Sequence, residues 1–112
     1  MINKYDFGKF TIGKKEYKHN IILLGEEIKR ARDLEDHKLK VDDIALLINA
    51  KPFVVIIGTG AYGLIKVPKD IVDYVKDRGI PLVIQPTEVA CKAYNDLTKR
   101  GKKVAAFLHN TC

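Results

Sequence analysis

Three strongly apolar segments dominate the second half of the chain, and they predict buried strands. They are Phe53–Ile57, Ile80–Gln85 and Lys103–His109, and the first is a continuous run of apolar, mostly β-branched residues. Strands that are covered on both faces have such continuous runs, whereas half-exposed strands alternate apolar and polar positions. We therefore expect these three segments to form the centre of a sheet.

Two amphipathic segments separate the predicted strands. The first opens at Pro68, has its apolar stripe at Ile71, Val72 and Val75, and ends before Gly79. The second opens at Pro86-Thr87, with Thr87 as the expected N-cap, and ends before Gly101. The spacing places one face of this second helix inward, made of Val89, Ala90, Ala93, Tyr94 and Leu97.

The first half of the chain predicts a hairpin and one further helix. Residues 7–24 alternate around a turn at Gly13-Lys14-Lys15, and Ile28–Ala31 reads as a short third strand. Residues 32–40 are polar and predict a loop. Val41–Asn49 predicts a helix, because its apolar residues recur at positions three and four apart.

This order of elements predicts a single α/β domain over residues 1–112. A strand, a crossover helix and another strand form a parallel unit, although the direction of the last strand stays open. Because the strands are apolar on both faces, helices must cover both sides of the sheet. We expect a three-layer domain with a central mixed β-sheet flanked by helices and an N-terminal β-hairpin at one side.

Composition narrows the class of protein. The chain has 112 residues, 46% of them hydrophobic, which is enough to form a core. No run approaches the length of a membrane span, and no signal pattern opens the sequence, so a cytoplasmic protein without membrane association is expected. Two cysteines fit a reducing compartment. The net charge of +6 is spread along the chain, which makes nucleic-acid binding a less favoured interpretation.

The best candidate for a binding site is the glycine-rich loop Gly58–Gly63 after the first buried strand. Gly58, Thr59, Gly60 and Gly63 would let backbone N–H groups approach an anion, and Lys66 would add positive charge. The spacing does not fit a dinucleotide fingerprint, because the helix opens several residues after the motif. The alternative interpretation is a tight turn that needs glycine for its backbone conformation.

Other polar residues offer weaker candidates. His109 and Cys112 lie close together after the last strand, as a thiol–imidazole pair would. Asn95 is expected to cap a loop or line a pocket beside Gly60, and Cys91 is expected to pack as a buried thiol. No spacing of these residues predicts a metal site, a cofactor or a catalytic set.

Several short motifs together resemble the Mth-type domain family. They are Gly58-Thr59-Gly60, Val67-Pro68, Pro86-Thr87, Val104–His109, Thr111-Cys112 and His37-Lys38-Leu39, the last with Asp36 in place of the family's usual glycine. The resemblance covers essentially the whole chain. It implies a mixed central sheet flanked by helices, no established reaction, and roles in assembly or regulation with other proteins.

The sequence therefore supports two functional hypotheses. The first is a non-catalytic protein-interaction or assembly factor with an unidentified protein partner. The alternative is a binding protein or an enzyme for a small or anionic ligand that uses the Gly58–Gly63 loop at the sheet edge, with Lys66, Asn95 and His109 as polar groups. In both hypotheses the protein needs no cofactor.

Overall fold

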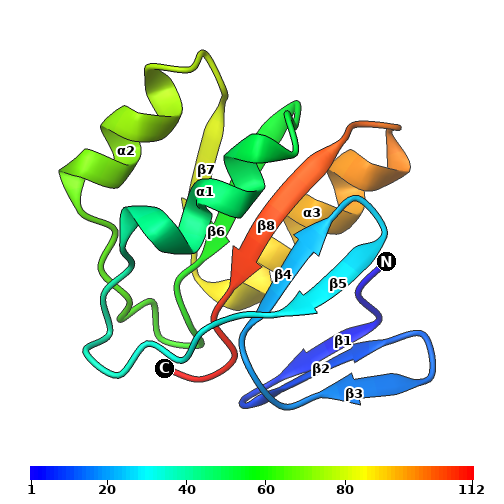
Figure 1. The fold of residues 1–112 in the computed structure, drawn as a ribbon. Coiled ribbons are helices and arrows are strands. Elements are labelled where there is room, and N and C mark those ends of the chain that lie inside the picture. The colour runs from blue at the N-terminus through cyan, green and yellow to red at the C-terminus, as the bar shows by residue number, and fades with distance from the viewer.

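The chain folds into eight strands and three helices (Figure 1). A computed structural model describes every residue from Met1 to Cys112. The strands are β1 (Lys4–Asp6), β2 (Lys9–Ile12), β3 (Lys15–Tyr17), β4 (Ile21–Leu24), β5 (Glu27–Arg30), β6 (Val54–Gly58), β7 (Leu82–Gln85) and β8 (Val104–Leu108). The helices are α1 (Val41–Asn49), α2 (Lys69–Lys76) and α3 (Thr87–Lys99).

The central sheet is mixed, and the last strand lies in its middle. The five strands follow the order β5-β4-β8-β6-β7. β8 pairs in parallel with β6 and antiparallel with β4, while β6 and β7 are parallel. Every residue of β6 and β8 is buried, as their apolar sequences require.

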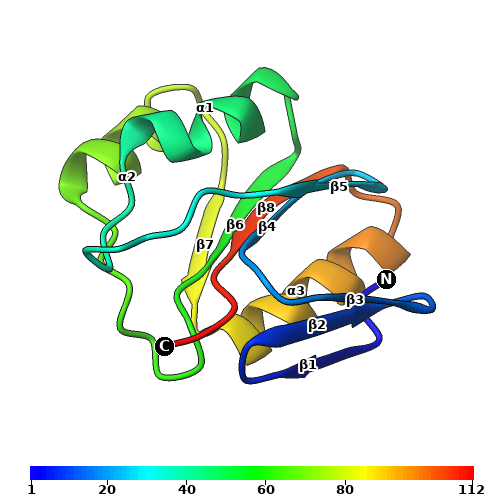
Figure 2. The same ribbon diagram turned by 60° about the horizontal axis from the view of Figure 1, so that its bottom comes forward.

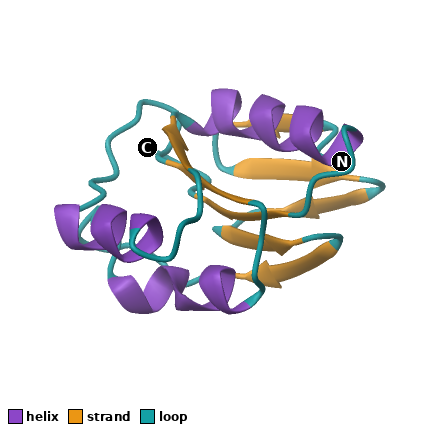
Figure 3. Ribbon diagram, turned by 90° about the horizontal axis from the view of Figure 1, so that it is seen from above, coloured by secondary structure: helices purple, strands orange, loops and turns teal.

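The two faces of this sheet carry different cores. Side chains alternate along β8, so that Phe107 packs under α1 and α2, whereas Leu108 packs on the side of α3. A second sheet, β1-β2-β3, lies beside α3 on that same side (Figure 2). Seen from above, helices lie on both sides of the strands (Figure 3). The predicted three-layer α/β class is confirmed.

The predicted hairpin forms around Gly13-Lys14, but its return strand ends at Tyr17 instead of running on to Leu24. β2 pairs with β3, and β1, which the sequence did not predict, completes the small sheet. Ile21–Leu24 leaves this sheet and pairs with β8 and β5 in the central one. The physical reason is burial, because Ile21, Ile22 and Leu23 are apolar on both faces and need a layer on each side.

Smaller differences concern the ends of elements. Phe53 is 52% exposed and lies under the Lys102 ammonium, 4.5 Å from the ring centre, so the buried strand begins only at Val54. Val89 is 47% exposed and does not belong to the inward face of α3, where Cys91 is buried instead. The N-cap of α3 is Pro86 rather than Thr87, and that of α2 is Pro68.

Candidate functional site

The glycine-rich loop starts inside the sheet, because its first glycine is the last residue of β6. A Cβ atom added to Gly58 would lie 2.8 Å from Leu108 Cδ2 and 3.1 Å from Thr87 Oγ1. These distances are too short for carbon atoms without a shift of the neighbours. Gly58 therefore allows the first turn of α3 to pack closely on the sheet.

Gly60 lies directly under the C-terminal segment. Its φ angle is +103°, a region that favours glycine, and an added Cβ would lie 2.6 Å from both the backbone C and O atoms of Cys112. The next residue, Ala61, donates its N–H to the carbonyl of Thr111 at 2.7 Å. The last residues of the chain thus cover the middle of the loop.

The hydroxyl of Thr87 connects the loop, α3 and the end of β8. It accepts a hydrogen bond from the N–H of Gly60 at 2.8 Å and donates one to the carbonyl of His109 at 2.7 Å. The N–H of Thr87 in turn donates to the carbonyl of Gly60 at 3.0 Å. Thr87 is completely buried, so this hydroxyl satisfies two backbone groups that water does not reach.

The N–H groups of the loop are largely used inside the protein. Thr59 donates its N–H to the carbonyl of Gln85 at 2.9 Å, and Gly63 donates to the carbonyl of Gly60 at 3.2 Å. Gly60 and Ala61 have the partners described above. An anion cradle needs free N–H donors, and these four are not free in this conformation. The geometry favours the tight-turn interpretation of the loop.

His109 follows β8, and Asn20 determines which ring nitrogen of His109 carries the proton. The side-chain oxygen of Asn20 accepts the N–H of Asn110 at 2.9 Å, and its nitrogen donates to the carbonyl of Arg32 at 3.0 Å. The orientation of this amide is therefore fixed by two backbone groups. Because His109 Nδ1 lies 2.8 Å from the same Asn20 oxygen, Nδ1 must carry a hydrogen and donate it.

The other ring nitrogen of His109 is an acceptor. Nε2 lies 3.2 Å from the Thr111 hydroxyl, which donates to it when the ring is neutral. His109 is buried, and burial together with the nearby His37 lowers the pKa of its imidazole below the ordinary value. His109 is thus held as a neutral imidazole with a defined tautomer.

A second imidazole, His37, meets His109 from the loop between β5 and α1. The two ring centres are 6.3 Å apart, and Nε2 of His37 lies 3.7 Å from the Cys112 sulfur. The backbone of Lys66 holds this loop in place, because its N–H donates to the carbonyl of His37 at 2.9 Å. The Lys66 side chain itself is exposed. His37 also has a positive φ of 54°, directly after Asp36, where the Mth-type motif has glycine.

The side chains of Asn20, His37 and His109 border a shallow depression of about 260 Å³ at the carboxyl end of β8. Ligands of open α/β sheets commonly bind at such ends. Its lining includes the two imidazoles of His37 and His109, but also the carboxylates of Asp33 and Glu35. No three His, Cys, Asp or Glu side chains of the protein lie close enough to hold a metal ion. The lining therefore contains two carboxylates and no lysine or arginine, and it does not form a positive surface.

Asn95 does not join this group. Its side-chain oxygen accepts the N–H of Ile2, and its nitrogen donates to the carbonyl of Ile2, both at 2.8 Å. Asn95 lies eight residues after Thr87 on α3, about 12 Å further along the helix. It fastens the N-terminal segment to α3 and does not line a pocket beside Gly60.

The sequence analysis did not group His37 and Asn20 with His109. They are 72 and 89 positions away from it, and only the pairing of β4 with β8 and of residue 38 with residue 66 brings them together. The one available signal was the His37-Lys38-Leu39 motif.

Fold and site together define a small mixed α/β domain whose strand-end loops are closed by its own C-terminal segment. The sequence profile of a family described as a protein of unknown function (DUF498/DUF598) matches residues 2–109. The chain belongs to this family.

Known proteins share both sequence and fold with the chain. A "13 kDa major membrane protein" of Francisella tularensis is 26% identical over 107 residues, which are 94% of this chain and 86% of that protein. A conserved hypothetical protein of Pyrococcus horikoshii OT3 superposes with a TM-score of 0.87 at 25% identity, over 100% of this chain and 99% of the other. A Mth938-like domain of Bordetella pertussis superposes with a TM-score of 0.70 at 18% identity, over 97% and 84% of the two chains. The predicted Mth-type membership is confirmed.

The name of the Francisella relative mentions a membrane. In the present chain the longest helix, α3, has 13 residues, and none of the three helices is long and apolar enough to cross a bilayer.

Proposed function

We propose that this protein is a non-catalytic interaction or assembly module that binds a protein partner through an apolar patch of Phe7, Tyr62 and Leu64. The observation that carries the proposal is the exposure of these three large side chains, at 58%, 72% and 56%. The rings of Phe7 and Tyr62 come from distant parts of the sequence and have their centres 6.0 Å apart. Leu64 follows Tyr62 by two residues in the same loop. Exposed apolar patches are a feature of protein interaction sites.

The patch is presented by a rigid support. Gly8, next to Phe7, donates its N–H to the carbonyl of Asn110 at 2.7 Å, and the Asn110 side chain donates back to the carbonyl of Gly8 at 3.2 Å. Ala61, next to Tyr62, is bonded to Thr111. Both turns are therefore tied to the same C-terminal segment, which reduces the entropy lost when a partner binds.

The kinds of side chain also suit a protein partner. Aromatic residues are enriched in interfaces and supply a large contact area with few rotatable bonds. The roles in assembly that the Mth-type resemblance implies agree with this proposal. The cytoplasmic location expected from the sequence stays a prediction, as does the low preference for nucleic acid.

Site-specific photo-crosslinking tests the proposal. A photoreactive phenylalanine analogue replaces Tyr62 in one variant and Val89 in another, since Val89 is a comparably exposed apolar residue on α3. In a lysate of the source organism, we expect a defined crosslinked protein from position 62 and none from position 89. Excess wild-type protein should compete for it, whereas a Tyr62→Ser, Leu64→Ser double variant should not.

The same crosslinked species from both positions, or equal competition by the double variant and the wild type, would contradict the proposal. A Val89→Ser variant is the matched control, because it removes a similar exposed apolar group without touching the patch. It should compete as well as the wild type.

A small ligand at the strand ends is the second candidate. The observation that favours it is the meeting of His37 and His109 in the depression described above, beside Gly58–Gly63 and the backbone of Lys66. Titration with phosphate, followed by the imidazole resonances of both histidines, tests it. Coincident saturable shifts that are lost in a His37→Ala variant would support this candidate, and unchanged resonances would dismiss phosphate as its ligand.

A further inference from the structure

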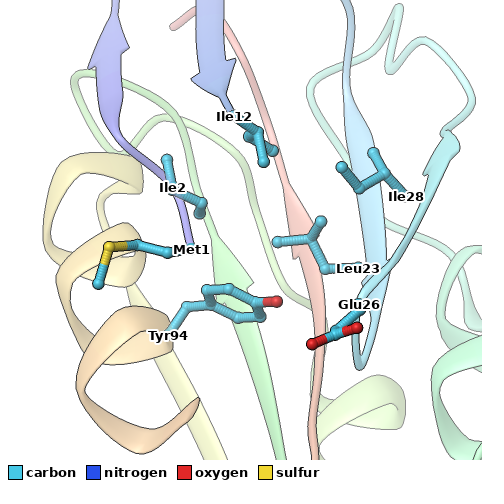
Figure 4. A pocket seen from close by; sticks show the side chains of 7 residues that line it. All are labelled: Met1, Ile2, Ile12, Leu23, Glu26, Ile28 and Tyr94. Atoms are coloured by element: carbon cyan, nitrogen blue, oxygen red, sulfur yellow. The ribbon is translucent and has the colours of Figure 1, made fainter. Parts of the chain in front are cut away.

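An apolar cavity lies between α3, the β4–β5 hairpin and the open end of the small sheet. Figure 4 shows the seven side chains around it, which are Met1, Ile2, Ile12, Leu23, Glu26, Ile28 and Tyr94. Six of the seven are hydrophobic, and the exposed side chains of Met1 and Glu26 stand at its edge. Its volume is about 180 Å³.

This volume suits a compact hydrocarbon group. Engineered apolar cavities of about 150 Å³ lined by similar side chains stay free of water and take up benzene or xenon. The wall residue Leu23 is almost fully buried, so the cavity reaches the core rather than lying on the surface. A bound ring or short alkyl chain would contact atoms that otherwise lack neighbours on one side.

Few polar groups line the cavity, and they differ in whether they have a partner within the protein. The hydroxyl of Tyr94 donates to the carbonyl of Gly25 at 2.8 Å, so it is already paired at the cavity wall. Glu26 contributes the only charged side chain of the lining, and it has no ion pair or hydrogen bond within the protein. In Figure 4 its carboxylate lies at the same end of the cavity as the hydroxyl of Tyr94.

We propose that this cavity binds a small alkyl- or arylamine, with the hydrocarbon group between Leu23 and Tyr94 and the protonated amine beside the Glu26 carboxylate. The apolar walls select the hydrocarbon part, and the single unpaired carboxylate selects a cation over an anion. The cavity is separate from the proposed interaction patch of Phe7, Tyr62 and Leu64. Phe7 lies at the turn of the β1–β2 hairpin, whereas Ile2 and Ile12 lie at its opposite end.

Three probes that share one ring test the proposal on the whole protein. Benzylamine, toluene and benzoate carry a positive charge, no charge and a negative charge, respectively. Methyl spectra by NMR should show saturable shifts of Ile12, Leu23 and Ile28 with benzylamine and toluene. Benzoate should bind more weakly than toluene.

Two variants distinguish the contribution of the Glu26 carboxylate to binding from that of the apolar cavity. Glu26→Gln should weaken benzylamine binding about three- to fivefold, the size expected for an exposed ion pair, and leave toluene binding unchanged. Ile28→Phe enlarges a wall residue and should abolish the binding of both. Because Glu26 is exposed, its variant retains the fold even if Ile28→Phe does not.

Two results would overturn the proposal. The first is the absence of shifts at the three methyl-bearing residues with any probe. The second is an unchanged benzylamine-to-toluene affinity ratio in Glu26→Gln, because the carboxylate would then make no contribution.

Discussion

The buried hydroxyl of Thr87 should be a main determinant of stability, and Thr87→Val isolates it. Valine keeps the size and branching of threonine but removes the hydroxyl. The N–H of Gly60 and the carbonyl of His109 then lose their partner in a place that water does not reach. Each unsatisfied buried group costs about 1–3 kcal/mol, so the loss of two partners should lower the free energy of unfolding by at least about 2 kcal/mol.

Thr87→Ser is the matched control. It keeps both hydrogen bonds and removes one buried methyl group, which costs about 1 kcal/mol. Urea unfolding followed by circular dichroism measures both variants. With typical slopes for a chain of this size, Thr87→Val should lower the midpoint by about 1–2 M, more than Thr87→Ser does. Faster hydrogen exchange at the Gly60 amide should accompany this loss.

The reasoning is refuted if Thr87→Val is as stable as Thr87→Ser or the wild type. That result would mean that the two backbone groups find other partners at no cost. An unchanged exchange rate at Gly60 would point to the same conclusion.

Three further predictions concern titratable groups. Burial alone would raise the pKa of Asp43, but hydrogen bonds from Arg32 at 2.7 and 2.8 Å and from the Lys40 amide hold it below the usual range. Asp43→Asn should therefore destabilise the protein at neutral pH by about 1–3 kcal/mol, measured by urea unfolding. The difference in stability from the wild type should shrink as the pH falls below about 4. A difference that does not change with pH would count against the ion pair. Burial and the neighbouring His37 lower the pKa of His109, so the unfolded state binds more protons below about pH 6.5. Wild-type stability should fall as the pH drops from 7 to 5, less steeply in His109→Asn, and an NMR-measured pKa at or above the ordinary value would refute this. Burial raises the pKa of the Cys91 thiol to about 12. A thiol reagent should therefore label only Cys112 in the folded protein and both thiols in urea. Labelling of two thiols in the native state would contradict the structure.

Local patterns in the sequence were sufficient to predict much of the secondary structure. The helix Val41–Asn49 agrees with its prediction at both ends, because Ile44, Leu47 and Ile48 define one buried stripe. The buried strands β6 and β8 followed from their continuous apolar runs. These are features that each segment carries within itself.

Pairing between distant segments was harder to predict. The apolar run Ile21–Leu24 follows β3 after three residues and reads as its continuation, yet it belongs to the other sheet. The sequence of Leu82–Gln85 is as apolar as that of a central strand, but the strand lies at an edge and is half exposed. Strand order depends on how the whole chain packs, and a local pattern does not contain it.

At the candidate site, too, the sequence predicted local features but not the contacts between distant segments. The sequence analysis grouped His109 with the glycine loop but left the direction of the last strand open, and the structure shows that both follow buried strands that are parallel. Of the two interpretations of the glycines, the geometry favours the tight turn, because Gly58 and Gly60 make room for α3 and the C-terminal segment. The sequence analysis grouped Asn95 with them because helix register alone does not reveal that its amide is bonded to Ile2.

The position of β8 has a consequence for how the protein matures. Since residues 104–108 separate β4 from β6, each of these two strands has an unfilled apolar edge until β8 has inserted between them. Helices α1 and α2 would meanwhile cover an incomplete surface. The stage before β8 inserts is then the one most prone to aggregation, and the one at which a chaperone would be needed most.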